Sequence, residues 1–399
     1  MTSSEDNRSA KPLHPQTELV TSGRDTAAQK GFINPPVVRG STVLYPNVED
    51  LHAHRGEFQY GRHGTPTTKA LQHALMALEG PQCAGVGIAP SGVAAISTAL
   101  LAVLNAGDHL LVIDSAYRPT RNFCDSLLKR FGIETTYFDP LIGAGIEKLI
   151  RPNTKAVLVE APGSQSFEMP DIPAIARVAH NHSLLVIDDN TWATPLYHRS
   201  LDQGVDISIQ AATKYIGGHS DIMFGTISAN ARAWPLITEA IRLLGVCAGP
   251  DDVFLALRGL RTLAVRLAHH QQAALDMAKW FVARPEVLRV IHPALESDPG
   301  HAIWKRDFTG ATGLFSIVLK PAPQKAVDAF LNALTLFGMG YSWGGFESLV
   351  IPFDCSSYRT ATTWNPGGPT LRFHIGLENF DDLKADLASG FDVFNAAAK

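Results

Sequence analysis

The chain has 399 residues, 45% of them hydrophobic and 18% charged, with a formal net charge of −4 and a mean hydropathy near zero. This composition excludes a disordered chain, lacks the basic excess of a nucleic-acid-binding surface, and predicts two or three domains. No apolar run approaches the roughly 18 residues of a transmembrane helix, and the polar N-terminus, with Glu5 and Asp6, is unlike a signal peptide. We therefore expect no nucleic-acid or membrane partner and a cytoplasmic location.

Residues 1–64 are predicted to form an extended arm rather than a domain of their own. Prolines recur through this segment and its hydrophobic residues show little periodicity, a pattern typical of irregular structure. The prolines are Pro12, Pro15, Pro35, Pro36 and Pro46. We expect an arm of this length to pack on another surface.

Short apolar runs alternate with amphipathic segments through residues 65–260. Strands that alternate with helices imply right-handed crossovers and a mostly parallel sheet with helices on both faces. The predicted strands are 84–89, 109–113, 134–138, 155–159, 184–187, 206–209 and 223–228. The predicted helices are 93–104, 120–131, 146–150, 172–180 and 234–244. We therefore expect an α/β domain with a mostly parallel seven-stranded sheet between helices.

The pattern changes in residues 261–399, which are predicted to form a smaller C-terminal α/β domain. A long amphipathic segment, 261–283, precedes a proline-interrupted stretch. Two strands and two helices follow. They are the strands 313–319 and 370–375 and the helices 324–337 and 381–394.

The cysteines and histidines do not indicate a disulfide framework or a metal site. The four cysteines are scattered without C-x-x-C spacing, so we interpret them as reduced packing residues. They are Cys83, Cys124, Cys247 and Cys355. Three histidine pairs, at 52/54, 180/182 and 269/270, have no third ligand at metal-binding spacing.

Chemically capable residues follow successive predicted strands. Open α/β sheets bind ligands beyond the carboxyl ends of their strands, where this chain places an amine, carboxylates, hydroxyls, an aromatic ring and a helix N-terminus. The residues are Ser91-Gly92-Val93, Tyr117, Glu160, Ser164, Asp188-Asp189-Asn190, Thr213 and Lys214. These are the groups that a site for pyridoxal 5'-phosphate (PLP) needs.

The chemistry of PLP gives each group a role. PLP is held as a Schiff base to a lysine, and an acidic group keeps its pyridine nitrogen protonated. Lys214 stands among small residues that leave room for a bulky ligand, and Asp188 and Asp189 are both candidates for the acid. The phosphate suits the helix N-terminus at Gly92, and Tyr117 is placed to stack on the ring.

Each residue also has an ordinary interpretation. Lys214 alone would be a solvated loop lysine, Asp189 a loop cap, Ser91 a helix N-cap and Tyr117 a half-buried aromatic residue. Gly85-x-Gly87-x-x-Pro90 resembles a dinucleotide fingerprint, but proline replaces its third glycine, and no acidic residue ends the next strand at the place expected for binding a ribose. A single ligand bound at this edge explains why chemically capable residues follow successive strands better than a separate structural reason for each residue does.

Two C-terminal residues and two residues of the arm complete the candidate set. Arg372 lies in a β pattern among apolar residues, so it needs an anion, either a structural carboxylate or a substrate carboxylate. Trp343 stands beside two glycines, which is typical of a pocket wall, although a packing tryptophan also fits. Tyr60 and Arg62, at the end of the arm, could hold a phosphate or a carboxylate.

These motifs resemble those of the Cys/Met-metabolism PLP-dependent enzymes (fold type I, γ-subfamily), and the resemblance covers residues 40–394. Within the family, the chain is most similar to bacterial members that cleave the β carbon–sulfur bond of cystathionine. The γ-acting relatives usually carry leucine where this chain has Trp343, which favours β over γ cleavage. The motifs are Tyr-Gly-Arg-His-Gly-Thr at 60–65, Phe-Asp-Pro-Leu-Ile-Gly at 138–143, Glu-Ala-Pro-Gly-Ser at 160–164, Ser-Ile-Gln-Ala-Ala-Thr-Lys at 208–214 and Ser-Trp-Gly-Gly at 342–345.

The resemblance implies a PLP-dependent transferase-like fold and a role for each candidate residue. Lys214 would bind the cofactor and move protons, Asp189 would be the pyridinium partner, and Tyr117 would stack on the ring and help to deprotonate the substrate amine. The implied phosphate ligands are Gly92, Val93 and Thr213, with Tyr60 and Arg62 from a neighbouring subunit. The implied substrate-binding residues are Ser342, Trp343 and Arg372. Because such a site is shared, the resemblance implies at least a dimer and, as in many relatives, a homotetramer.

The implied reaction is α-proton abstraction and β-elimination, which would convert L-cystathionine into homocysteine, pyruvate and ammonia. Other PLP reactions on sulfur amino acids stay open: cleavage of cystine or cysteine conjugates, γ-elimination from cystathionine or methionine, and sulfhydrylation. A non-catalytic binding protein on the same fold is a remote alternative. The chain departs from the family pattern at Ala211, where many relatives have a phosphate-binding serine, and at Ser164, where many have asparagine.

Overall fold

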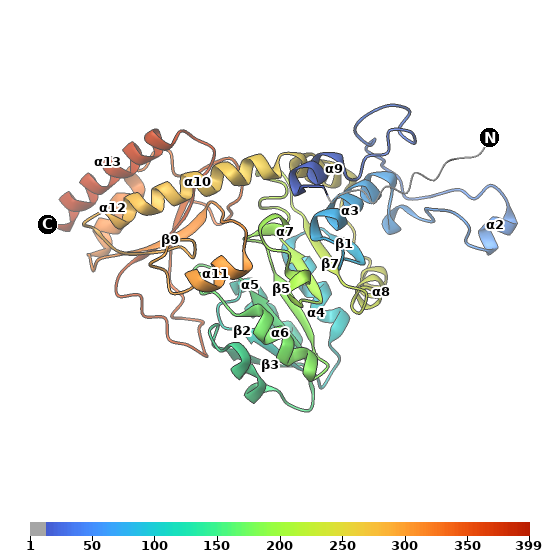
Figure 1. Cartoon of the computed structure of the whole chain (residues 1–399), viewed down its shortest axis with the longest axis horizontal. Coiled ribbons are helices and arrows are strands. Elements are labelled where there is room, and N and C mark those ends of the chain that lie inside the picture. Colours follow the sequence, from blue (N-terminus) through green and yellow to red (C-terminus); the bar gives the residue numbers. More distant parts are fainter. Residues whose placement is uncertain (1–12) are drawn as a thin grey trace.

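The computed structural model describes residues 13–399, which contain a seven-stranded and a four-stranded sheet. Figure 1 shows the four-stranded sheet with α10, α12 and α13 toward the C-terminal end of the molecule, and the seven-stranded sheet with its helices beside it. An arm that carries α2 projects from the opposite end (Figure 1). The two sheets correspond to the larger and smaller α/β parts that the sequence predicts.

The seven-stranded sheet confirms the predicted, mostly parallel architecture. Its strand order is β1-β7-β6-β5-β4-β2-β3, and only β7 runs antiparallel to its neighbours. Predicted strands 109–113 and 134–138 match the observed bounds, and the other predicted bounds differ by one or two residues. The strands are β1 (Gly85–Ala89), β2 (His109–Ile113), β3 (Glu134–Phe138), β4 (Thr154–Glu160), β5 (Leu185–Asp189), β6 (Ile207–Gln210) and β7 (Gly225–Ala229).

Helices pack on this sheet and cover it, so that five of its seven strands, β1, β2, β5, β6 and β7, are buried along their whole length. Glycine allows the closest approach: a Cβ added at Gly85 of β1 would lie 2.2 Å from the Trp234 ring of α8. The helices packed on or beside the sheet are α3 (Pro66–Glu79), α4 (Gly92–Val103), α5 (Arg118–Phe123), α6 (Ile172–Asn181), α7 (Thr194–Tyr197), α8 (Trp234–Leu244) and α9 (Pro250–Arg261).

Some helical segments differ from the prediction. The segment predicted as helix 120–131 begins earlier as α5, with proline in its first turn, and continues as the π-helical segment η2 (Cys124–Leu128). The segment predicted as helix 146–150 is the 3-10 helix η3 (Gly143–Leu149). The prediction does not include α3 and α9, although each begins at a proline. Two further short 3-10 helices are η1 (Gly61–His63) and η4 (Ser200–Gln203).

The four-stranded sheet is antiparallel, with the order β10-β11-β9-β8. Predicted strands 313–319 and 370–375 correspond to β9 (Leu314–Leu319) and β11 (Thr370–His374). The prediction does not include β8 (Val287–Ile291) and β10 (Leu349–Phe353), which are edge strands; edge strands tolerate a charged residue or a proline within an apolar run. The remaining helices here are α11 (His301–Asp307), α12 (Gln324–Ala333) and α13 (Phe380–Ala398).

Helix α10 (Leu263–Val282) belongs to the cores of both sheets. Its first half places Leu263 and Leu267 in the core of the seven-stranded sheet. Its second half places Met277 and Phe281 in the core of the four-stranded sheet. The domain boundary predicted between residues 260 and 261 therefore precedes a helix shared by both cores, and it stays a prediction.

The described part of the arm is less extended than predicted. Helix α1 (Pro15–Thr21) buries Leu19 and packs against α3 and α10. Its first helical residue is a proline, which suits that position because no helical hydrogen bond is lost there. Farther along, the arm carries the short helix α2 (Val48–His52) and exposes large apolar side chains. These include Phe32, Ile33, Leu44, Val48 and Leu51.

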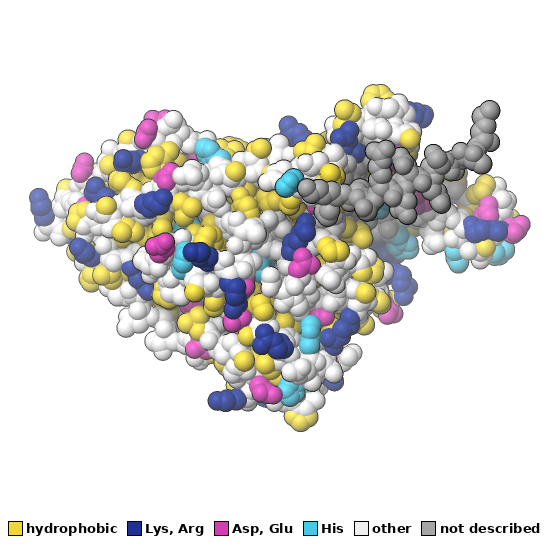
Figure 2. Space-filling model, viewed as in Figure 1, with side chains coloured by type: hydrophobic (Ala, Val, Ile, Leu, Met, Phe, Trp, Pro, Cys, Tyr) yellow, Lys and Arg dark blue, Asp and Glu magenta, His cyan; other side chains and the backbone are white. Residues whose placement is uncertain are grey.

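The charges on the surface, the helices and the cysteines can be compared with the remaining predictions from the sequence. Figure 2 shows basic and acidic side chains interspersed over one face of the described chain. Within residues 13–399, no helix is both long and apolar enough to cross a membrane, and no cluster of three His, Cys, Asp or Glu side chains could hold a metal ion. All four cysteines are free and three are buried, but Cys247 is exposed, so its interpretation as a packing residue is wrong.

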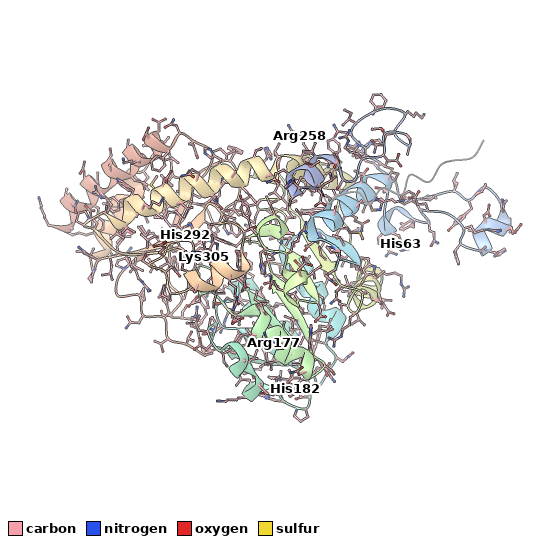
Figure 3. All side chains as sticks on the ribbon, viewed as in Figure 1. His63, Arg177, His182, Arg258, His292 and Lys305 are labelled. Carbon is pink, nitrogen blue, oxygen red and sulfur yellow. The ribbon has the colours of Figure 1, made fainter. Side chains whose placement is uncertain are left out.

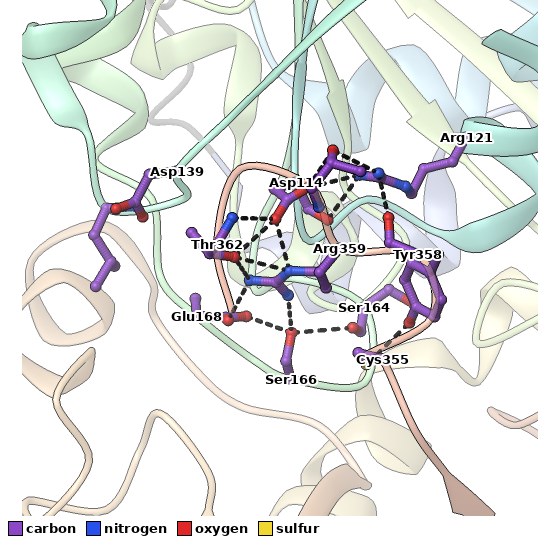
Figure 4. A network of polar contacts seen from close by, with 12 residues as sticks. Asp114, Arg121, Asp139, Ser164, Ser166, Glu168, Cys355, Tyr358, Arg359 and Thr362 are labelled. Atoms are coloured by element: carbon purple, nitrogen blue, oxygen red, sulfur yellow. Dashed lines mark hydrogen bonds and ion pairs between the residues drawn. The ribbon is translucent and has the colours of Figure 1, made fainter. Parts of the chain in front are cut away.

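A buried ion-pair network attaches the loop of residues 354–362 to the carboxyl end of β2 (Figure 4). Asp114 pairs with Nη1 of Arg121 at 2.9 Å and with Nε of Arg359 at 3.0 Å, and all three side chains are at most 3% exposed. Burial alone would raise the pKa of Asp114, but hydrogen bonds from Thr360 and Thr362 and the Arg359 charge lower it to about 2. The carboxylate thus stays charged and holds the loop in place.

We expect Arg359→Ala to lower the free energy of unfolding by about 3 kcal/mol, because removing one partner leaves Asp114 a buried and under-compensated charge. Arg151→Ala is a suitable control, since the side chains of Arg151 and its partner Glu134 are 46% and 67% exposed and such pairs contribute about 0–1 kcal/mol. Urea unfolding followed by circular dichroism measures both changes. Equal losses in the two variants would contradict a stabilising role for the buried network.

Candidate active site

Neighbouring strands bring the main candidate residues to one edge of the large sheet. Strand β4 ends at Glu160 and β5 ends at Asp189. In the sheet register, Asp189 is flanked by Glu160 on one side and by Ile209 of β6 on the other. Lys214 lies in the turn that follows β6. This edge contains the carboxyl ends of parallel strands, where α/β proteins bind ligands.

The amine of Lys214 belongs to a half-buried side chain beside Ser342 and Trp343. Its Nζ donates a hydrogen bond to Oγ of Ser342 at 2.7 Å and lies 5.4 Å from the centre of the Trp343 ring. Burial and the positive charge of Arg372 lower the pKa of Lys214 to about 8, although Asp189 opposes this shift. At pH 7 about a tenth of the amine is therefore uncharged, and this form can act as a nucleophile or a base.

Asp189 lies on the Lys214 side of the sheet, and Asp188 faces the other side. Oδ1 of Asp189 accepts hydrogen bonds from the amide and the hydroxyl of Thr191. Burial raises the pKa of Asp189, whereas the Thr191 bonds and Lys214 favour its charged form. Because side chains alternate along a strand, Asp188 points away, with its Oδ2 3.9 Å from Nε2 of His198. Of the two, only Asp189 can meet a ligand bound to Lys214.

The N-terminus of α4 offers a cradle for an anion. Oγ of Ser91 accepts a hydrogen bond from the Ala94 amide at 3.1 Å, whereas the amides of Gly92 and Val93 donate to no protein group in the described chain. A Cβ added at Gly92 would lie 2.6 Å from Cβ of Ala211, so a glycine is needed where α4 approaches the turn before Lys214. Free amides and the helix dipole favour a phosphate here.

The hydroxyl of Thr213 is already engaged within the protein. It donates to the Phe224 carbonyl at 3.1 Å and accepts from the Phe224 amide at 2.9 Å. To donate to a phosphate it would have to leave that carbonyl, so its role as a phosphate ligand stays a prediction. At the two positions that depart from the family, Ala211 has no hydroxyl to offer, and the Ser164 amide donates to the Ser115 carbonyl at 2.9 Å.

Tyr117 is held by a carboxylate to which the sequence analysis assigned no role. Oε2 of Glu160 accepts a hydrogen bond from the Tyr117 amide at 2.7 Å. Burial and the nearby charge of Asp189 raise the pKa of Glu160 well above its ordinary value. The Tyr117 side chain is 42% exposed and lies near Asp189 and Arg372, so its ring is available to stack on a ligand. The sequence places Glu160 at a strand end, but its partner, the Tyr117 amide, is 43 residues away in the chain and leaves no sequence signal.

Arg372 is a buried guanidinium that forms no ion pair with Asp or Glu in the described chain. It lies on β11, is 7% exposed, and its Nη2 donates to the carbonyls of Tyr341 at 3.1 Å and Ser342 at 3.3 Å. Burial lowers its pKa to about 10. A buried cation is costly unless an anion compensates it, and a planar guanidinium binds carboxylates well.

Tyr60 and Arg62 form no hydrogen bond with the other candidate residues in the described chain. Nη1 of Arg62 donates to the Arg242 carbonyl of α8 at 3.1 Å, and its guanidinium lies 5.8 Å from the centre of the Tyr60 ring. Tyr60 is 43% exposed. Their position on the arm is compatible with contacts to a second subunit, which stay a prediction.

The groups around Lys214 match the polar parts of PLP. The Lys214 amine suits its aldehyde, the Asp189 carboxylate suits its pyridine nitrogen, and the free amides of Gly92 and Val93 suit its phosphate. Arg372 then remains for the carboxylate of a substrate. These residues therefore fit the cofactor.

Comparisons with known proteins agree with this chemistry. A family model described as Cys/Met metabolism PLP-dependent enzyme matches residues 16–392. A putative cystathionine β-lyase of Rhizobium johnstonii is 54% identical over 95% of this chain and 96% of its own length. The cystathionine β-lyase MetC of Escherichia coli is 44% identical over 94% of this chain and 97% of its own length.

The fold agrees as well. The structure of a cystathionine γ-synthase from Xanthomonas oryzae pv. oryzae, in complex with aminoacrylate and cysteine, superposes with a TM-score of 0.89 at 32% identity, covering 97% of this chain and 100% of that chain. This similarity confirms the predicted PLP-dependent transferase-like architecture. The chain belongs to the Cys/Met metabolism family of PLP-dependent enzymes, and its cofactor is pyridoxal 5'-phosphate.

Proposed function

We propose that this protein is a PLP-dependent carbon–sulfur β-lyase that cleaves L-cystathionine to homocysteine, pyruvate and ammonia. One observation carries the proposal: a lysine of lowered pKa lies near the carboxylate of Asp189 and near an arginine, Arg372, that forms no ion pair in the described chain. The amine and the carboxylate suit the cofactor, and the arginine suits an amino-acid substrate.

The relatives support β-cleavage over γ-chemistry. Relatives with the printed name cystathionine β-lyase are 44% and 46% identical to this chain, and one called putative is 54% identical. The solved cystathionine γ-synthase and γ-lyase are 32% and 30% identical. Trp343, beside Lys214, stands where γ-acting relatives usually have leucine. The γ-reactions remain the second candidate because they use the same fold.

Arg372 would orient the substrate. One nitrogen of its guanidinium, Nη2, donates hydrogen bonds to the carbonyls of Tyr341 and Ser342, which fix its orientation. The other nitrogens remain for the α-carboxylate of an amino acid, with which a guanidinium can form two parallel hydrogen bonds. Binding the carboxylate there, near Lys214, would direct the substrate's amino group and Cα toward the Lys214 side of the pocket.

Lys214 would move the proton. The bound cofactor supplies an electron sink for the pair of electrons left at Cα when its proton is removed. Lys214, once replaced by the substrate amine, is a base in a partly desolvated site and can take that proton at Nζ. Ser342 accepts a hydrogen bond from the same Nζ, so it would help to direct the amine. Cleavage of the β carbon–sulfur bond then releases the thiol, with one water consumed in forming pyruvate and ammonia.

A second copy of the chain would complete the site. Tyr60 and Arg62 are proposed phosphate ligands, yet they lie on the arm without hydrogen bonds to the cradle at Gly92 in the described chain. The arm also exposes Leu44, at 86%, and Phe32, at 75%, which would be covered by a neighbouring subunit. We therefore propose at least a homodimer, with a tetramer built from two dimers.

The product of cystathionine cleavage tests the proposed function. We expect the purified enzyme to release pyruvate and homocysteine, and Lys214→Ala to release neither because it removes both the cofactor link and the base. Chromatography of the derivatised 2-oxo acids distinguishes pyruvate from 2-oxobutyrate. Formation of 2-oxobutyrate would assign γ-cleavage instead, and a colourless protein with full activity would refute the PLP mechanism.

Substitution of Arg372 tests carboxylate recognition. We expect Arg372→Lys to reduce kcat/KM by about 10- to 100-fold, since it keeps a charge but loses the paired hydrogen bonds. Arg372→Ala should reduce it further. Steady-state kinetics with cystathionine measure both variants, and Arg289→Ala on β8 is a control because Arg289 lies on a different strand and is exposed. Similar kinetics for Arg372→Ala and the control would exclude this role.

The pH dependence of cofactor uptake tests the lowered pKa of Lys214. The neutral amine is the nucleophile, so the rate at which cofactor-free enzyme takes up PLP should rise with pH through about 8. The charge of Arg372 contributes to this lowering, and Arg372→Ala should therefore move the midpoint to higher pH. Stopped-flow absorbance measures the rate. A wild-type midpoint near the ordinary value of 10.5 would contradict the desolvation of Lys214.

A further inference from the structure

The loop of residues 341–346, here called the serine–tryptophan loop, packs directly on Lys214. Ser342 accepts the hydrogen bond of Nζ at 2.7 Å, and the Trp343 ring lies 5.4 Å from Nζ. Gly344 has a φ of +86°, and an added Cβ would lie 2.9 Å from the Lys214 carbonyl carbon. The loop can approach so closely only because this residue is a glycine. Any shift of the loop would therefore move Ser342 and Trp343 relative to the amine.

Two residues of β11 hold this loop. Arg372 binds its beginning through the carbonyls of Tyr341 and Ser342. His374 binds its end: the Gly344 amide donates to Nε2 of His374 at 3.2 Å, and the Gly345 carbonyl lies 3.2 Å from the same atom. Residues two apart on a strand share a face, so both contacts come from one face of β11. Arg372 is also the proposed partner of the substrate carboxylate, whereas the side-chain hydrogen-bond contacts of His374 to this loop are its role near Lys214.

The surroundings of His374 make it a rigid support. It is 1% exposed, and its ring lies 5.1 Å from the His270 ring and 5.9 Å from the Tyr215 ring. Tyr215 follows Lys214 in the chain and itself packs on Trp343, with ring centres 5.4 Å apart. The imidazole thus lies in one aromatic cluster with the residue after Lys214 and with the tryptophan of the loop. Burial and the neighbouring His270 keep its pKa well below the ordinary value, so the ring is neutral at working pH.

We infer that His374 is a positioning residue of the active site, which holds the serine–tryptophan loop so that Ser342 and Trp343 remain in contact with the Lys214 amine. Within the described chain it forms no hydrogen bond with Lys214, and it acts through the main chain of Gly344 and Gly345. The consequence for turnover rests on the proposed function, but the consequence for the Lys214 amine does not.

The competing explanation is that His374 is an ordinary core histidine. His292 provides the matched control (Figure 3). It is 0% exposed, its Nδ1 accepts a hydrogen bond from the Ala294 amide at 3.1 Å, and its ring packs 5.7 Å from the Phe315 ring. Each histidine is therefore buried, aromatic-packed and bonded to one main-chain amide, but only His374 contacts the serine–tryptophan loop.

The experiment compares His374→Leu, His374→Gln and His292→Leu by two measurements. The first is the pH midpoint for competitive acetylation of Lys214 in cofactor-free enzyme, followed by mass spectrometry. The second is kcat/KM of the PLP-loaded enzyme with cystathionine. Leucine removes the hydrogen-bond acceptor and keeps an apolar side chain of moderate size, whereas the Gln oxygen can still accept from the Gly344 amide.

We expect His374→Leu to raise the acetylation midpoint above about 8, because the amine loses its partner Ser342 and gains water, and to reduce kcat/KM by about 10- to 100-fold. His374→Gln should recover much of both losses. His292→Leu should leave both values within about twofold of wild type, even if it unfolds at a lower temperature.

The inference is overturned if His374→Leu and His292→Leu give the same acetylation midpoint. Should His374→Leu fail to fold, His374→Asn takes its place, because its shorter side chain cannot reach the Gly344 amide, and the same comparison decides. If the wild-type enzyme releases no pyruvate, the proposed function fails, while the acetylation measurement still tests the positioning role.

Discussion

The site depends on holding two cations out of water beside a single carboxylate. Burial and the charge of Arg372 lower the pKa of Lys214 to about 8, and Arg372 forms no ion pair within residues 13–399. Asp189 offsets only part of this positive charge. Uncompensated charges in a protein interior are costly, so the arrangement favours anions. The phosphate of the cofactor and the carboxylate of an amino acid are anions of suitable size.

The two cations come from different sheets, so the structure between the sheets must be fixed. Lys214 follows a strand of the seven-stranded sheet, and Arg372 lies on β11 of the four-stranded sheet. Helix α10 places side chains in both cores, and the ion pairs of Asp114 attach the loop of residues 354–362 to β2 (Figure 4). The serine–tryptophan loop crosses between Lys214 and β11. Contacts that take no part in the chemistry thus help to set the separation of the two charges.

The sequence predicted best those features that depend on residues close together in the chain. Buried strands are short apolar runs, and their bounds could be predicted within two residues; the groups that follow them could then be assigned to one edge of a sheet. Glu160 and His374 could not be assigned roles, because their partners are main-chain amides distant in the chain. The engagement of Thr213 with Phe224 is equally invisible to a pattern of residue types. Helix α1 was missed because proline at a helix start resembles proline in an irregular arm.

The alternation of side chains along β5 shows how narrowly the site is specified. Asp188 and Asp189 are adjacent, but one faces His198 in the interior and the other faces Lys214. Shifting the register of β5 by one residue would exchange them. Asp189 has donors in Thr191 and a cation opposite, both of which favour its charge, whereas its neighbour Glu160 has one amide donor and a pKa raised by burial and by Asp189 itself. The two carboxyls would repel each other if both were ionised in this desolvated row. Burial raises the pKa of both carboxyls, but the surroundings favour the charged form more strongly at Asp189 than at Glu160. A protonated pyridine nitrogen would give the aspartate one further donor.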